Sequence, residues 1–231
     1  MLDIIRANER GRAHFGWLQS QHTFSFGDYY NPQQMGFSVL RVLNDDQVAP
    51  GAGFSTHGHR NMEIISYVLA GTMAHKDSAG HEQLLPAGEF QLMSAGKGIY
   101  HSEYNASKTA DLKFLQIWIE PNSKDTEPSY QQKAFSQAPG LNWVITPDGR
   151  DGTLQIKQNA AVAQLILAQQ AALAMPLAAN KAYYLHLIAG ELSLNNHHLS
   201  AGDGVKLTGL QALKLQSHDT AVNALWFELP A

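Results

Sequence analysis

Two short stretches of the sequence decide the fold: Gly53-Phe-Ser-Thr-His57-Gly-His59-Arg-Asn-Met-Glu63 and Gly98-Ile-Tyr-His101-Ser-Glu103. In a β-strand, residues i and i+2 project from the same face of the sheet. His57 and His59 would therefore present two imidazoles on one side of a strand, and His101 and Glu103 repeat this arrangement. Two such pairs on neighbouring strands would bring their nitrogen and oxygen atoms to one point. The spacing predicts a metal site within a β-structure.

The donor atoms limit which ion such a site would hold. Three imidazoles and one carboxylate suit one divalent transition metal, among them Fe(II), Ni(II), Mn(II), Cu(II), Zn(II) and Co(II). An octahedral ion held by these residues keeps two positions open, whereas a structural zinc site is closed at four ligands. The chain has no cysteine, which excludes thiolate sites, disulfides and a cysteine nucleophile. The alternative, ordinary surface histidines, fits two such pairs among glycines less well.

The rest of the chain reads as short apolar runs separated by Gly, Pro, Asn and Asp, which is typical of an all-β sandwich or barrel. The runs that we expect to be strands are Phe37–Leu43, Glu63–Leu69, Phe90–Met93, Leu112–Ile119, Tyr183–Ile188 and Val222–Phe227. One segment disagrees, because Asn159–Met175 is rich in Ala, Gln and Leu and local propensity favours a helix there. We nevertheless expect strands in that segment, because of an internal repeat.

The repeat pairs two halves of the chain. Tyr67-Val-Leu-Ala-Gly71, followed by Leu85–Leu92, is similar to His186-Leu-Ile-Ala-Gly190, followed by Leu199–Lys206. In both copies a strand reaches a glycine turn, and a small-residue turn starts the next strand. A spacing this long indicates two related domains rather than a solenoid. We expect an N-terminal domain over residues 1–135 and a C-terminal domain over 136–231.

The second copy lacks the metal-binding side chains. In the first copy, the candidate ligands stand at fixed intervals from Gly71 and Gly88. The same intervals from the corresponding glycines of the second copy, Gly190 and Gly202, lead to other residue types. The positions reached are Pro176, Ala178, Leu215 and Ser217. Only the serine could contact a metal, and it is a poor ligand for these ions. The sequence therefore predicts a metal site in the N-terminal domain and none in the C-terminal domain.

The motifs resemble those of a known family. The patterns Gly53…His57-x-His59-x-x-x-Glu63…Gly71 and Gly80-x5-Pro86-x-Gly88 look like the two signature motifs of the cupin superfamily. The surrounding segments resemble the pirin family of bicupins, notably His22-Thr-Phe-Ser-Phe26 and Ser94-Ala-Gly-x-Gly-Ile-x-His-Ser-Glu103. The resemblance runs over residues 6–121 and is weak over 136–231.

This resemblance implies a fold, a metal and an activity. The fold would be all-β, with two antiparallel β-barrels packed face to face. The metal, commonly iron and so expected as Fe(II), would be held by His57, His59, His101 and Glu103. The activity would be that of a quercetin 2,3-dioxygenase, which opens the heterocycle of a flavonol with dioxygen and releases carbon monoxide. The partners would then be a small aromatic substrate and O2.

Glu63 competes with Glu103 for the carboxylate role. In many cupins the glutamate of the first motif is itself a ligand, and its parity keeps Glu63 on the face of His57 and His59 if the strand is unbroken. The pirin resemblance gives this role to Glu103, so we expect Glu63 to orient an imidazole from outside the ligand set. Either carboxylate could take the proton of a metal-bound substrate hydroxyl, so Glu103 and Glu63 are both catalytic candidates.

Aromatic and histidine side chains near the N-terminus allow two interpretations. His22 is more simply explained as a hydrogen-bonded residue within a loop, since buried polar groups need partners. The functional alternative is that His22, Phe24 and Phe26 line the mouth of the metal cavity. Phe54 and Trp118 are expected to fill the barrel rather than to hold a substrate.

The bulk properties exclude several other functions. The net charge is −4 without a basic cluster, which argues against a nucleic-acid partner and a polybasic membrane anchor. No run of about 18 apolar residues or secretory signal is present, so we expect a cytoplasmic protein without membrane contact. We expect a monomer, because a duplicated barrel supplies the contact that single cupins gain by dimerising. Two other functions stay open: a metal-containing regulator that binds a transcription factor or metabolic enzyme, and a metal-dependent isomerase or hydrolase.

Overall fold

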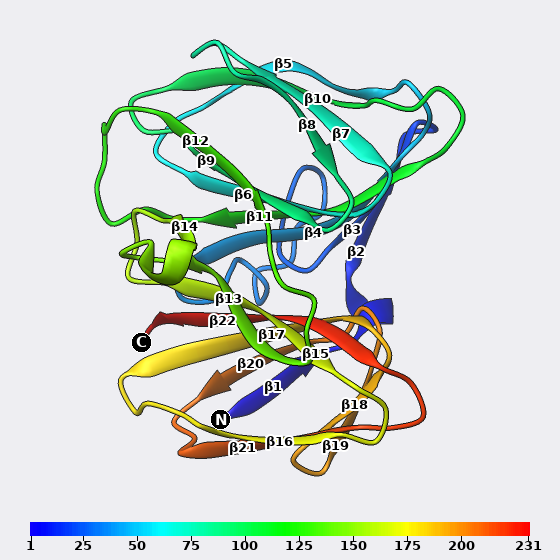
Figure 1. The fold of residues 1–231 in the computed structure, drawn as a ribbon, viewed down its shortest axis with the longest axis vertical. Helices are drawn as coiled ribbons and strands as arrows, with labels where there is room; N and C mark the ends of the chain where they lie inside the picture. The colour runs from blue at the N-terminus through cyan, green and yellow to red at the C-terminus, as the bar shows by residue number, and fades with distance from the viewer. The chain divides into compact units, whose positions relative to one another are not determined.

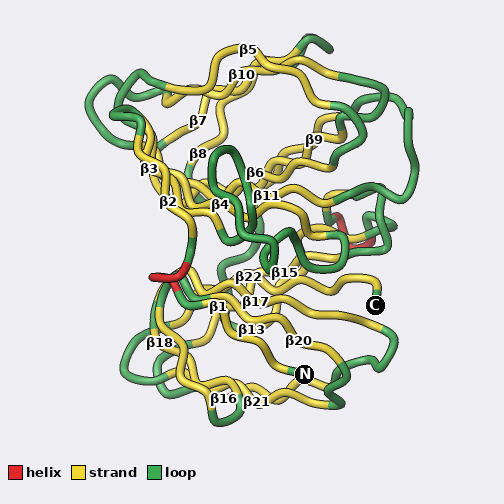
Figure 2. The backbone as a smooth tube through the Cα atoms, turned by 180° about the vertical axis from the view of Figure 1, so that it is seen from behind, coloured by secondary structure: helices red, strands yellow, loops and turns green.

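The computed structural model describes residues 1–231 and is built almost entirely of antiparallel β-strands (Figure 1). Its only helices are two short 3-10 turns, η1 (Ala7–Glu9) and η2 (Arg150–Gly152), which Figure 2 draws in red. Neither turn has the length or the apolar character that crossing a bilayer requires. The chain divides into two compact units, one of residues 11–135 and 156–158 and one of residues 1–10, 136–155 and 159–231. We call them the site unit and the companion unit.

The site unit consists of two sheets. The seven-stranded sheet has the order β12 (Ser129–Ala134), β9 (Glu89–Ser94), β6 (Glu63–Ala70), β11 (Leu112–Ile119), β4 (Leu40–Val48), β3 (Leu18–His22) and β2 (Gly11–His14). The four-stranded sheet has the order β5 (Gly53–His59), β10 (Ile99–Asn105), β7 (Thr72–Asp77) and β8 (Glu82–Pro86). The expected all-β cupin fold is confirmed. The expected closed barrel is corrected to a sandwich, because hydrogen bonding is not continuous between the two sheets.

The companion unit repeats this arrangement. Its larger sheet has the order β1 (Leu2–Ile5), β20 (Gly204–Thr208), β17 (Lys181–Ala189), β22 (Val222–Pro230), β15 (Ala161–Leu167), β13 (Gly140–Thr146) and β14 (Leu154–Gln155). Its smaller sheet has the order β16 (Ala172–Pro176), β21 (Ala212–Ser217), β18 (Glu191–Leu194) and β19 (His197–Ser200). The segment 159–175 thus forms strands despite its helix propensity, as the repeat predicted, because tertiary pairing overrides local preference.

Two turn glycines anchor the correspondence between the units. Gly71 and Gly190 both have positive φ, 83° and 88°. A Cβ at Gly71 would collide with the backbone at the start of β11, and a Cβ at Gly190 would collide with the backbone at the start of β22. Only glycine tolerates this combination without strain. Pairing these two residues aligns β6 with β17 and β11 with β22. The strand registers then extend the alignment to the other strands.

The units differ from the expected division at residue 135 in two segments. Residues 1–10 belong to the companion unit because β1 pairs with β20, with Leu2 opposite Leu207. Residues 156–158 belong to the site unit, where the Gln158 side chain donates a hydrogen bond to the Glu120 carbonyl at 2.7 Å. Each domain is therefore completed by a segment from the other side of the sequence boundary.

Candidate metal centre

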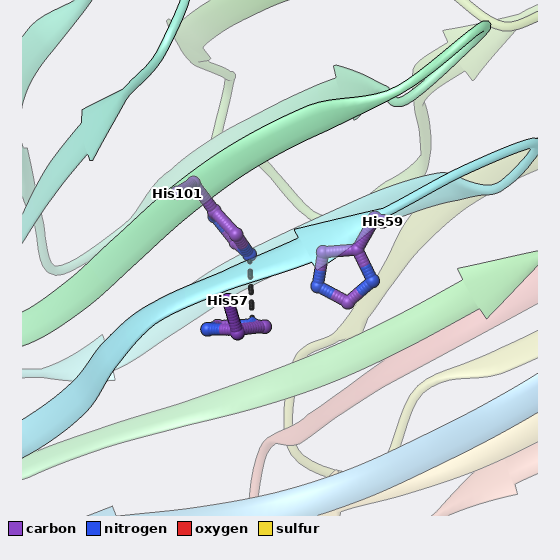
Figure 3. A group of neighbouring side chains, drawn as sticks. All are labelled: His57, His59 and His101. Carbon is purple, nitrogen blue, oxygen red and sulfur yellow. Dashed lines mark hydrogen bonds between the residues drawn. The ribbon is translucent and has the colours of Figure 1, made fainter.

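Antiparallel pairing of β5 with β10 brings three histidines together. His101 lies opposite His57 and Ile99 lies opposite His59, so the three imidazoles project into the sandwich from one sheet (Figure 3). The ring centroids are 4.5 Å apart for His57 and His101, 4.8 Å for His57 and His59, and 4.9 Å for His59 and His101. Each imidazole offers a nitrogen within 4.8 Å of the other two. The pairing of two i,i+2 motifs on neighbouring strands thus occurs as the sequence predicted.

A β-bulge in β5 aims the first of these imidazoles. Phe54 lies opposite Glu103 but His57 lies opposite His101, so β5 carries one residue more than β10 in this interval. Bulges of this kind redirect side chains and are common beside active sites. The Nδ1–H of His57 donates a hydrogen bond to the Ser55 carbonyl in the bulge at 2.8 Å. Nε2 of His57 is then the nitrogen that faces His101.

The geometry fits a shared metal ion. Nε2 of His57 and Nε2 of His101 are 3.1 Å apart. Two nitrogens bound to one ion at about 2.1 Å and at right angles would be about 3 Å apart. Burial, together with the neighbouring imidazoles, lowers the pKa values of His59 and His101 to about 3. Both rings are therefore neutral near pH 7, which is the form that coordinates a metal.

Glu103 lies deeper in the sandwich and is grouped with His101 and His75 rather than with His57 and His59. Its carboxylate is fully buried and accepts hydrogen bonds from Ser66 Oγ at 3.1 Å and from the Gln116 side-chain amide at 3.0 Å. Burial raises the pKa of Glu103 above its ordinary value, although His75 and the hydrogen bond from Ser66 act in the opposite direction. Its ligand-type oxygen lies within 4.8 Å of nitrogens of His75 and His101, which makes a second three-residue group that overlaps the first.

Sequence reasoning missed His75. On β7 it lies opposite Glu103, and its Nε2 is 3.1 Å from the Asp77 carboxylate, which also contacts His81 Nδ1 at 3.0 Å. Burial raises the pKa of Asp77, but hydrogen bonds from His75 and His81 outweigh it and the net shift is downward. His75 and Asp77 form a third i,i+2 pair of ligand-type residues in the sequence, and this signal could have placed His75 next to the site.

Glu63 does not lie where the sequence analysis expected it. The strand ends at His59 and a new strand begins at Glu63, so the parity argument across the intervening turn fails. The Glu63 carboxylate accepts hydrogen bonds from Ser94 Oγ at 2.8 Å and from the backbone N–H of Lys157 at 3.2 Å. Burial raises its pKa. The expectation that Glu63 orients an imidazole is corrected, because its partners are Ser94 and Lys157.

A transverse row of buried polar residues crosses the inner face of the large sheet and supports Glu103. It has one member on each of four neighbouring strands, opposite one another in register: Asn44 (β4), Gln116 (β11), Ser66 (β6) and Gln91 (β9). The two central members are the residues that bind the Glu103 carboxylate. Buried polar groups are tolerated when they are hydrogen-bonded, and the two central members meet that condition through Glu103.

A cavity of about 800 Å³ opens beside the imidazoles and is lined by His57, His59 and Gln116. Its walls include the aromatic side chains Phe15, Trp17, Phe26, Tyr29, Phe54 and Trp118. Phe54 and Trp118, expected to be barrel filling, therefore lie on the cavity wall. Among the three residues considered for its mouth, His22 and Phe26 line the cavity, whereas Phe24 is buried elsewhere.

The companion unit has no such polar interior. Strand registers place Met175, Leu177, Leu213 and Leu215 at the positions of His57, His59, His101 and Glu103. Counting from Gly190 and Gly202 in the sequence reached other positions. The count was displaced by one or two residues because the turns between corresponding strands differ in length between the two units. All four belong to or pack against one apolar core cluster, which leaves no imidazole or carboxylate there.

Comparisons with known proteins agree with this geometry. The family model described as Pirin matches residues 5–119, and the model described as quercetinase C-terminal cupin domain matches residues 143–229. A quercetin 2,3-dioxygenase of Escherichia coli K12 is 44% identical over 230 residues, covering 100% of this chain and 99% of the relative.

Two solved structures extend the comparison. The bacterial pirin YhhW of Escherichia coli in complex with nickel(II) superposes with a TM-score of 0.96 at 43% identity, covering 100% of this chain and 99% of that one. The Escherichia coli protein YhaK superposes with a TM-score of 0.77 at 29% identity, covering 96% of this chain and 98% of that one. On the full-length identity and the family match, this chain belongs to the pirin family.

Proposed function

We propose that the protein is a metal-dependent dioxygenase that opens the heterocycle of a flavonol such as quercetin with O2. The observation that carries this proposal is the convergence of three imidazoles beside an aromatic-lined cavity of about 800 Å³. Cavities of this size hold a drug-sized planar ligand with most of its surface buried. The 44% identical relative named quercetin 2,3-dioxygenase supports the choice of substrate class.

In this proposal His57, His59, His101 and Glu103 hold one divalent metal, which we propose to be Fe(II). The donor set of imidazole nitrogens and a carboxylate suits iron and also nickel, the ion bound by the 43% identical pirin. When bound, the metal would act as a Lewis acid that makes the substrate hydroxyl more acidic and supplies open positions for substrate or O2. All four ligands come from one site unit, so a single chain can complete the site.

The protein's own residues then orient the substrate and move its proton. Gln116 lines the cavity and donates to one oxygen of Glu103, so the carboxylate lies just behind the cavity wall. Because burial raises its pKa, Glu103 is a better proton acceptor than an exposed carboxylate. Trp17, Phe54 and Trp118 provide apolar walls that exclude water from the flavonolate. We propose Glu103 as the general base.

The proposal is tested by loading metal-free protein with Fe(II), Ni(II), Mn(II) or Cu(II) and adding quercetin in air. We expect loss of flavonol absorbance, uptake of one O2 and release of one carbon monoxide per turnover with at least one ion. His57→Ala should abolish turnover together with metal retention, whereas Glu103→Gln should lower turnover more than it lowers binding of quercetin.

Absence of turnover with every ion, in protein shown to hold metal, would contradict the dioxygenase assignment. Binding of a transcription factor or metabolic enzyme that persists in His57→Ala would then support the regulator considered from the sequence.

A further inference from the structure

One wall of the cavity carries a cluster of buried polar side chains that the proposed chemistry does not use. Its members lie on β3 and β4 and all line the same cavity as the imidazoles: Ser20, His22, Asn44 and Asp46. Each is 5% exposed or less. We call this set the polar wall.

Hydrogen bonds fix the polar wall in one arrangement. Ser20 Oγ donates to Asp46 Oδ1, and Ser20 Oγ also lies 3.3 Å from His22 Nδ1. The Nδ1–H of His22 donates to the Asn44 side-chain oxygen at 2.9 Å. Direct strand pairing underlies both contacts, because Ser20 is opposite Asp46 and His22 is opposite Asn44. The wall is therefore rigid and presents a carboxylate to the cavity.

The fold itself does not need this polarity. The strand registers place Leu141, Trp143, Ala163 and Leu165 of the companion unit at the positions of Ser20, His22, Asn44 and Asp46. All four companion residues belong to or pack against its apolar core cluster. The same strand positions are thus filled with apolar side chains in the companion unit. Because an apolar residue fills this position in the companion unit, a carboxylate that lines the cavity points to recognition of a polar group of the ligand.

The chemistry of the wall selects one kind of partner. A carboxylate accepts hydrogen bonds and donates none, so its best neutral partner is a hydroxyl group. Such charge-assisted hydrogen bonds are roughly twice as strong as neutral ones. A flavonol held at the imidazoles through the oxygen substituents of its heterocycle would have its phenyl substituent elsewhere in the cavity. Hydroxyl groups on that substituent could donate hydrogen bonds to the carboxylate of the polar wall.

We propose that Asp46, positioned by Ser20, determines substrate specificity by accepting hydrogen bonds from phenolic hydroxyl groups on the part of the substrate remote from the three imidazoles. The substrate class in this inference rests on the proposed function. The preferred substrates are flavonols with hydroxylated phenyl rings, and flavonols without these hydroxyls bind more weakly.

Binding in the absence of O2 tests the inference separately from turnover. Dissociation constants are measured on metal-loaded and metal-free protein by quenching of tryptophan fluorescence, since Trp17 and Trp118 line the cavity. The probes are quercetin, kaempferol and galangin, which carry two, one and no hydroxyl groups on the phenyl ring. In the unmodified protein we expect affinity to fall in that order.

Three variants locate the effect. Asp46→Asn should weaken quercetin binding about tenfold and Asp46→Leu, which copies the companion residue, more than tenfold, as expected when a hydrogen bond to a charged group is lost. Galangin binding should change by less than about twofold. Ser20→Ala should give a smaller change in the same direction. Asp45→Asn is the matched control, because Asp45 is the neighbouring residue of the same strand and is not part of the cavity lining.

Equal binding of the three flavonols by the unmodified protein, or an equal loss for all three in Asp46→Asn, would overturn the inference. Circular dichroism spectra identical to those of the unmodified protein establish that each variant is folded. If Asp46→Leu does not fold, Ser20→Ala still tests the inference. If the preference for hydroxylated flavonols is present but none is consumed in air, the proposed dioxygenase activity fails while the inference about Asp46 holds.

Discussion

The site unit and the companion unit share the order of their five central large-sheet strands but have opposite interiors. The row that crosses the large sheet is Asn44, Gln116, Ser66 and Gln91 in the site unit. At the same positions the companion unit has Ala163, Trp226, Leu185 and Val205, all within its apolar core. The fold is therefore compatible with a fully apolar interior. The central polar residues of the row instead hold the Glu103 carboxylate.

The comparison also separates stability from function. In the companion unit the indole of Trp226 is buried and stacks on Tyr183 with ring centroids 5.1 Å apart, so the interior is filled by large side chains. In the site unit the corresponding region contains Gln116 and the cavity. Substitutions in the companion interior should therefore change the free energy of unfolding, whereas substitutions in the site interior should mainly change metal binding and turnover.

The largest expected effect is loss of the imidazole group. His57→Ala should lower kcat/KM for quercetin by at least about a thousandfold, equivalent to about 4 kcal/mol of transition-state stabilisation, because the metal is no longer held. Metal content after desalting should fall in parallel. His197→Ala, an exposed histidine of the companion unit, is the control and should retain both metal and activity. Full turnover in His57→Ala would contradict the site.

The next effect concerns the companion core. Trp226→Ala should lower the free energy of unfolding by about 3–5 kcal/mol, because it opens a cavity in a fully packed interior. Trp17→Ala is the same substitution on the wall of an existing cavity and should cost clearly less. Chemical denaturation of the metal-free protein measures both. Equal costs would show that the two interiors do not differ in packing as described.

A smaller effect is expected at His75. Removing residues that support metal ligands typically weakens metal binding by about 10–100-fold, so His75→Gln should weaken metal binding within that range. His81→Gln, one contact further from Glu103, should weaken it less. Competition with a chelator measures both affinities. An unchanged affinity in His75→Gln would show that the residue supports only the fold.

The pH dependence of stability offers a prediction on the companion side. Burial, with Arg10 nearby, holds the pKa of His186 well below its ordinary value of 6.5. The unfolded chain binds a proton at this residue below pH 6.5 while the folded chain does not, so stability is present above that pH and lost as the pH falls. One such proton changes the free energy of unfolding by up to about 1.4 kcal/mol per pH unit. His186→Gln should remove this part of the slope in denaturation curves between pH 7.5 and 5.

The smallest effect on activity is expected at Glu63. Because its contacts are Ser94 and Lys157, Glu63→Gln should leave kcat/KM for quercetin unchanged within about twofold. A loss comparable to that of Glu103→Gln would return Glu63 to the reaction. This pair of variants therefore tests which of the two buried carboxylates serves the metal centre.

Much of the fold was predictable because its signals are local. Period-two spacing selected His57, His59, His101 and Glu103 as candidates, of which the structure groups the three histidines. The glycine turns at Gly71 and Gly190 indicated the duplication. The repeat also gave the correct strands in segment 159–175 against its helix propensity.

What the sequence could not predict depends on strand register and on contacts between distant segments. The bulge between Phe54 and His57 adds one residue to β5 relative to β10. The sequence spacing of the histidines does not indicate it. The place of Glu63 depended on a break in the strand after His59. Likewise, β1 joins the companion unit through pairing with a strand nearly the whole chain length away.

The central claim is that one metal ion binds at the imidazoles of the site unit and none binds in the companion interior. Crystals of the protein loaded with Fe(II) or Ni(II), measured at the absorption edge of the metal, test it directly. The account predicts a single anomalous peak within bonding distance of Nε2 of His57, His59 and His101 and of the Glu103 carboxylate. No peak at that position in metal-loaded protein, or a peak only at other histidines such as His197, would contradict it.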